Sequence, residues 1–234
     1  MQAEDRIIHF SAELIHRPIQ PRKEALQKLY YELSQTRTAA YDSSDFTNPV
    51  QARFHSRRGQ KTQSIALFLP DRAVLIEEWT DLALSDFLEK LREVATRLMA
   101  ARGIQRYAAH TVTLRSTFAL SQFEDARLFL IDHVCNQAGM LGPHFQRPVA
   151  TGGLRFVLPE TNEHPGNLHI LIESFRHSRN EVFVEAKGVF TRPPLGPAEL
   201  GMVDDHARYV RTFVTGRVFP FLNQYDVSGD ASYE

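Results

Sequence analysis

The side chains best placed to do chemistry lie at alternate positions of two predicted neighbouring strands, residues 167–175 and 181–189. Because successive side chains of a strand point to opposite faces, these positions share one face of the predicted sheet. The set combines imidazole, acidic, basic and aromatic groups: His169, Glu173, Phe175, Phe183, Glu185 and Lys187. Such a mixture suits contact with a ligand, a peptide or a partner subunit.

Arginine and histidine side chains extend this face to two more predicted strands: Arg53, His55 and Arg155. We interpret the face as a whole as a binding surface. For each residue taken alone, an ordinary exposed strand side chain is the better explanation, and a cross-strand ion pair between Glu173 and Lys187 is one example.

The second interpretation is an enzyme whose site matches no known motif and is built from His169, Glu173, Glu185 and Lys187. The carboxylates of Glu173 and Glu185 could approach each other across a hairpin. However, the chain contains no nucleotide-binding glycine motif, no G-x-S-x-G elbow and no short histidine or cysteine spacing typical of metal sites. We therefore assign no catalytic residue, no metal ligand and no cofactor.

The third interpretation is a saddle-like nucleic-acid binder. Basic spots lie beside aromatic residues that could stack on bases: Arg53, Arg57, Arg58, Arg176 and Arg179, with Phe54, Tyr107 and Phe175. The formal net charge of −1 lacks the excess of Lys and Arg that such a partner normally demands, so nucleic acid ranks below a protein partner.

Composition is that of an ordinary globular protein, with 43% hydrophobic and 24% charged residues in a chain of 234. Cys135 is the single cysteine, so no intrachain disulfide can form, which fits a reducing cytoplasm. The acidic N-terminus does not resemble a signal peptide, and no run approaches the roughly 20 apolar residues of a membrane span. We expect a cytoplasmic protein with no membrane partner.

These side chains must be positioned by strands and helices, and hydrophobic periodicity predicts the same order of elements twice. In the first half the elements are a strand at 7–14, a helix at 22–35, strands near 51–58, 63–69 and 72–79, and a helix between Ser85 as N-cap and Gly103 as C-cap. Residues 36–50 are predicted to form a loop.

In the second half the elements are a strand at 107–118, a helix at 123–136, strands near 153–158, 167–175 and 181–190, and a helix at 203–219 that Pro220 ends or kinks. Sparse identities support the repeat, since His9 and His110 lie 101 positions apart. We divide the chain into a first half at 1–104, a second half at 105–225 and a flexible tail at 226–234.

The stretch from Pro70-Asp71-Arg72 through Glu78-Trp79 to Thr113-Leu114-Arg115 resembles a broad group of uncharacterised bacterial proteins. Their pattern is a hairpin, a helix of F-x-x-x-L periodicity, and a strand with a Leu-Arg-aromatic-x-Asn core. Here Ser116-Thr117 follow Leu114-Arg115, so the aromatic residue and the asparagine are absent. The resemblance covers under half of the chain and implies a similar fold alone, because the group has no assigned activity.

The sequence therefore predicts an α+β protein of two pseudo-repeated β-α-β-β-β-α halves, with a mainly antiparallel sheet and helices packed on one face. Its layout also resembles the tandem saddle of TATA-binding-type proteins, an analogy that does not fix function. The leading hypothesis is a non-enzymatic binding or accessory protein that uses the mixed face for a protein partner or for self-association as a homodimer. A small ligand is the alternative occupant.

Overall fold

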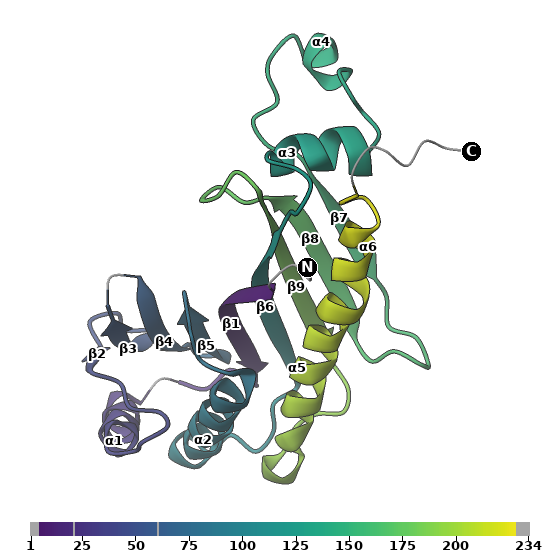
Figure 1. Cartoon of the computed structure of the whole chain (residues 1–234). Coiled ribbons are helices and arrows are strands. Elements are labelled where there is room, and N and C mark those ends of the chain that lie inside the picture. Colours follow the sequence, from purple (N-terminus) through teal and green to yellow (C-terminus); the bar gives the residue numbers. More distant parts are fainter. Residues whose placement is uncertain (1–4, 21, 60, 228–234) are drawn as a thin grey trace.

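The computed structural model describes residues 5–20, 22–59 and 61–227. Within these residues, nine antiparallel strands form one open sheet in the order β2-β3-β4-β5-β1-β6-β9-β8-β7 (Figure 1). The strands are β1 (Asp5–Ile15), β2 (Ser43–Asp45), β3 (Ala52–Arg58), β4 (Thr62–Phe68), β5 (Arg72–Glu78), β6 (Ala109–Ala119), β7 (Gly153–Leu158), β8 (Asn167–Ser174) and β9 (Glu181–Phe190). The α+β class and the antiparallel sheet are confirmed.

The helices connect and cover these strands. They are α1 (Lys23–Ser34), α2 (Leu84–Arg102), α3 (Ala126–Leu128), α4 (Leu141–Phe145), α5 (Gly201–Phe213) and α6 (Phe219–Asn223), with π-helical segments at Phe129–Val134 and Val214–Val218 and a 3₁₀ turn at Pro197–Glu199. No helix in the described part of the chain is long and apolar enough to cross a membrane.

Several element boundaries differ from the sequence-based prediction. Helix α2 begins one residue before Ser85, after Ala83 as N-cap, whereas Gly103 does end it, at a φ of 69° that favours glycine. The helix predicted at 123–136 is mostly π-helical, and Pro220 does not end the last helix, because it lies at the start of α6 where no intrahelical N–H is needed. The predicted loop at 36–50 contains the short strand β2.

One face of the sheet carries the hydrophobic core. The register places Phe10, Leu114 and Ala186 side by side across β1, β6 and β9, and all three are buried. Helix α2 contacts β1, α5 contacts β6 and β9, and α1 contacts β3 (Figure 1). We call this side the helix face, and its alternate apolar residues explain why these segments become half-buried strands.

The other side of the sheet, which we call the open face, carries the remaining alternate residues. It includes His9, Arg115, Glu185 and their neighbours in register. Its centre is shielded by its own larger side chains, since Thr117 and Thr113 on β6 are buried there without a covering helix.

A buried carboxylate anchors the chain just beyond α6. Asp226, the first residue of the predicted tail, is buried, and its carboxylate accepts hydrogen bonds from the backbone N–H groups of Ser121 and Gln122 and from the Ser121 hydroxyl. This contact ties a residue three positions beyond the end of α6 to the segment just after β6. Residues 228–234 of the predicted tail lie outside the described part of the chain.

Candidate binding face

A row of polar side chains crosses the middle of the open face, one from each strand that the row traverses. From β3 to β7 the row is Arg57, Gln63, Glu78, His9, Arg115, Glu185, Leu171 and Arg155. Its arginine and glutamate side chains alternate in the sign of their charge, and Gln63, His9 and Leu171 lie between them. Alternation of this kind offers a partner complementary charge at several points along one line.

Short contacts hold the centre of this row in place. The Gln63 amide donates to Glu78 over 2.8 Å, and the Arg115 guanidinium Nε donates to a Glu185 carboxylate oxygen over 2.6 Å. His9 Nδ1 lies 4.0 Å from a Glu78 carboxylate oxygen, and His9 is buried between Glu78 and Arg115. The charged groups are therefore arranged before any partner arrives.

Burial, and secondarily the adjacent positive charge of Arg115, lowers the pKa of His9 to about 4. His9 is therefore neutral at physiological pH. The sequence-based prediction left His9 out, because its pairing with Arg115 depends on a long-range register between β1 and β6.

Acidification is expected to destabilise the fold through His9. Its pKa falls from 6.5 in the unfolded chain to about 4 in the fold. Between these values the unfolded chain binds a proton that the folded chain does not, so the contribution of His9 is complete above 6.5 and declines toward pH 4, by about 1.4 kcal/mol per pH unit.

Urea unfolding of the wild type and of His9→Gln, each at about pH 7 and about pH 5, measures this effect. We expect the wild type to lose about 2 kcal/mol more than the variant over that interval. His16, His110 and His206, whose pKa values burial also lowers, are common to both proteins and drop out of the difference. Equal losses would contradict the assignment.

An aromatic cluster lies at one end of the open face and joins residues distant in sequence. It consists of Trp79, Phe175, His177 and Phe183. The Trp79 ring centroid lies 5.4 Å from that of His177 and 6.3 Å from that of Phe175, and Phe175 stacks on Phe183 with centroids 6.2 Å apart. Trp79, Phe175 and Phe183 are partly exposed, so this apolar surface remains available to a partner.

The backbone of Trp79 is held in an unusual conformation. Its φ is 50°, in the left-handed region that bulky residues rarely adopt. The Trp79 N–H donates to the Ile8 carbonyl over 2.7 Å, and its carbonyl accepts from the Thr62 hydroxyl over 2.9 Å. Hydrogen bonds to two neighbouring strands thus hold the backbone from which the indole projects. The positive φ costs conformational energy, and backbone strain of this kind concentrates at functional sites.

A hollow of about 460 Å³ lies on the open face over β7, β8 and β9. Four predicted site residues line it together: Arg155, His169, Glu185 and Lys187. Leu171 and Val189 also line it, so the hollow combines apolar and charged side chains.

The remaining predicted site residues are not part of this hollow. Phe175 and Phe183 belong to the aromatic cluster, and Glu173 lies opposite Phe183 in the register of β8 and β9. Arg53 and His55 lie on β3, five strands away from β9. The predicted set therefore shares one face, but the fold divides it among three places.

The structure contradicts three expectations drawn from the sequence. Glu173 faces Phe183 and Lys187 faces His169, so the expected ion pair between Glu173 and Lys187 does not form. Glu185 faces Leu171 on β8 and pairs with Arg115 on its other side, so the two carboxylates do not meet. Phe54 and Tyr107 are buried in the core, where neither can stack on a base.

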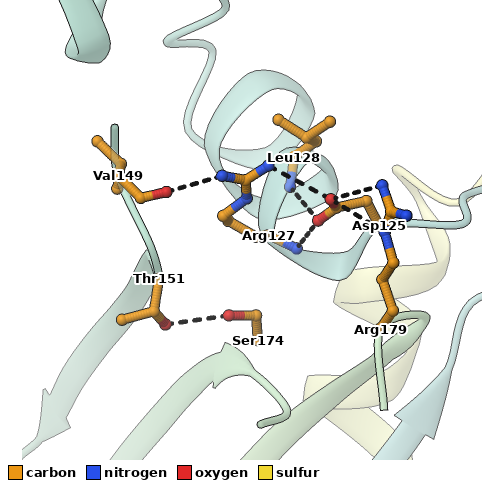
Figure 2. A network of polar contacts seen from close by, with 7 residues as sticks. All are labelled: Asp125, Arg127, Leu128, Val149, Thr151, Ser174 and Arg179. Carbon is orange, nitrogen blue, oxygen red and sulfur yellow. Dashed lines mark hydrogen bonds and ion pairs between the residues drawn. The ribbon is translucent and has the colours of Figure 1, made fainter. Parts of the chain in front are cut away.

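A second hollow of about 460 Å³ adjoins the aromatic cluster, because Phe175 is part of both. Phe175 and Arg176 lie in the turn after β8 and line this hollow. Figure 2 shows Asp125 there between the guanidinium groups of Arg127 and Arg179. Burial opposes ionisation of Asp125, but the N–H of Leu128 and the Arg127 guanidinium outweigh it and lower the carboxyl pKa. Asp125 thus caps α3 and holds the rim of this hollow.

Another hollow, of about 710 Å³, lies beside the end of β5, and a buried polar cluster of Ser64, Glu77 and Lys90 contributes to its lining. Lys90 Nζ lies 2.8 Å from a Glu77 carboxylate oxygen, and the Ser64 hydroxyl donates to the same oxygen over 2.7 Å. Lys90 Nζ also bonds to Ser64 and lies 4.5 Å from the centroid of the buried Tyr41 ring. Burial, and secondarily the charge of Glu77, raises the pKa of Tyr41.

This cluster was not predicted from the sequence, although the positions of Glu77 and Lys90 in their apolar patterns indicate it. Glu77 alternates with Ala73 and Leu75, which places its carboxylate on the helix face of β5. Lys90 falls in the apolar stripe of α2 beside Phe87 and Leu91. A charge at a core position in each of two packed elements indicates a buried ion pair.

No protein-family model matches the chain, and no curated protein matches its sequence.

Proposed function

We propose that the chain is a non-enzymatic binding or accessory protein and that its open face receives a partner protein. The observation that carries this proposal is the aromatic cluster, in which Trp79 is held at a φ of 50° against Phe175. Tryptophan and arginine are the residues that most often dominate the binding energy of protein interfaces. Trp79 and Arg115 supply both types on one face.

Charge supports a protein partner over a nucleic acid. The polar row alternates acidic and basic groups, and Glu78 and Glu185 interrupt its positive charge. A polyanionic strand lying along this row would meet both carboxylates, whereas a protein surface can present complementary charges to each. A saddle-like nucleic-acid binder therefore remains the weaker proposal.

The test is partner recovery with matched variants. The wild-type chain, the double variant Phe175→Ser with Phe183→Ser, and Tyr31→Ser are each used to capture proteins from cells. Tyr31 is 68% exposed on α1, away from the open face. The proposal requires a protein that the wild type and Tyr31→Ser both retain and that the double variant loses.

A second candidate function is favoured by the hollow that gathers Arg155, His169, Glu185 and Lys187. A small ligand carrying a carboxylate would meet two cations there, Arg155 and Lys187, together with the apolar side chains of Leu171 and Val189. If the small molecule is also converted there, the chain is an enzyme with its active site in this hollow. Native mass spectrometry of the purified protein tests both, because a bound small molecule adds mass that Arg155→Ala should remove.

We also propose that residues 1–104 and 105–225 are pseudo-equivalent halves. Strand order supports this proposal, because the strands follow the order β1-β5-β4-β3 on one side of the sheet centre and β6-β9-β8-β7 on the other. Under this proposal the aromatic cluster and the polar row both cross the junction of the halves, where β1 pairs with β6.

A further inference from the structure

The two edges of the sheet are protected very differently. At one edge, β2 is only three residues long and polar, with sequence Ser-Ser-Asp. At the other edge, β7 is six residues long, contains no proline and carries a single charge, Arg155. Short, polar or charged edge strands resist pairing with another chain, and β7 lacks these safeguards.

Strand β7 also exposes consecutive apolar side chains. Phe156, Val157 and Leu158 are 41%, 55% and 37% exposed. On its inner side β7 is fully paired with β8, from Gly153 opposite Glu173 to Leu158 opposite Leu168. Its outer row of backbone N–H and C=O groups faces no other strand of the described sheet.

We propose that β7 pairs antiparallel with β7 of a second copy of this chain, so that the two sheets become continuous. A twofold axis perpendicular to the sheet keeps the helix faces of both copies on one side and the open faces on the other. Directly opposed residues of an antiparallel pair point to the same face, so each possible register is centred on one residue.

Charge and apolar matching select the register centred on Phe156. This register sets Phe156 against Phe156 of the second copy and Leu154 against Leu158, all on the helix face. It sets Arg155 against Val157 on the open face. The register centred on Arg155 would oppose two like charges directly, and the register centred on Val157 would pair fewer residues.

The strand is therefore self-complementary, which favours a second copy over an unrelated chain. The dimer would place two open faces side by side in one sheet with nine strands from each copy. The aromatic clusters would stay exposed, because they lie over β5, β8 and β9 rather than on β7.

Sedimentation equilibrium of the full chain across the micromolar range tests the proposal. We expect a reversible monomer–dimer equilibrium for the wild type. Val157→Lys places a lysine opposite Arg155 of the second copy, twice by symmetry, and should weaken dimerisation about tenfold or more. Val157→Glu places a carboxylate at the same positions, and its dimer should be at least as tight as the wild type's.

Val157 is largely exposed, so neither substitution removes core packing, and an unchanged unfolding midpoint verifies this. Ser44→Lys, at the opposite edge, should leave the dimerisation constant unchanged. A wild type that is monomeric throughout the concentration range would overturn the proposal. Equal dimerisation constants for Val157→Lys and Val157→Glu would overturn it as well.

Discussion

Replacing Lys90 with methionine is expected to lower the free energy of unfolding by about 3–5 kcal/mol. The Lys90 and Glu77 side chains are 6% and 5% exposed and form an ion pair of 2.8 Å. Removing the ammonium leaves the Glu77 carboxylate buried beside Ser64 without its counter-charge, and such a charge is far more costly than the loss of a surface ion pair. Urea unfolding monitored by circular dichroism measures the effect.

Two controls separate the charge effect from a loss of packing. The double variant Lys90→Met with Glu77→Leu removes both charges, and its stability should return close to that of the wild type. Lys28→Met removes the lysine of an exposed pair with Glu32 on α1, and should change stability by less than about 0.5 kcal/mol. A single Lys90→Met variant as stable as the wild type would show that the ion pair contributes nothing.

The buried ion pair also matters for the candidate binding face. Glu77 precedes Trp79 by two residues, so the contact between α2 and β5 fixes the strand end from which the indole projects. The helix face and the open face are thus linked through one strand. The ion pair on the helix face therefore helps to position Trp79 on the open face.

The double variant Phe175→Ser with Phe183→Ser is expected to weaken binding of the recovered partner at least about 30-fold, which corresponds to about 2 kcal/mol. The two rings stack 6.2 Å apart and support the indole of Trp79. Serine removes both the contact area for a partner and the support that orients the tryptophan. Isothermal titration calorimetry with the recovered partner measures the change.

The fold should survive this change, because both phenylalanines are only partly buried. The expected loss of stability is below the roughly 3–5 kcal/mol of a fully buried phenylalanine. Tyr31→Ser should keep the wild-type affinity, since Tyr31 lies on α1 away from the face. An unchanged affinity in a folded double variant would remove the aromatic cluster from the binding site.

Local patterns in the sequence predict much of the sheet. Alternating residues and the Pro70-Asp71 turn place β4 and β5 within about a residue, and β9 is predicted with its observed bounds. The stripe of Phe87, Leu91 and Val94 predicts α2. Alternation also assigns the predicted site residues to one face, because the period of a strand is fixed by its backbone.

Long-range features were beyond such patterns. The pairing of β1 with β6 joins residues about a hundred positions apart, and together with the pairing of β6 with β9 it places Arg115 between His9 and Glu185. In the observed register Glu173 lies opposite Phe183, four residues from Lys187, and a shift by an even number of residues keeps every side chain on its face. The positive φ of Trp79 has no signal in residue type, since tryptophan does not favour that region.

Photo-crosslinking from the open face shows whether a partner protein contacts this surface. A benzophenone amino acid is placed at position 183, in the aromatic cluster, or at position 31, on α1, and each protein is irradiated in living cells. We expect a discrete protein adduct from position 183 that is absent from position 31. An adduct of equal yield from both positions, or none from position 183, would contradict a binding role for the open face.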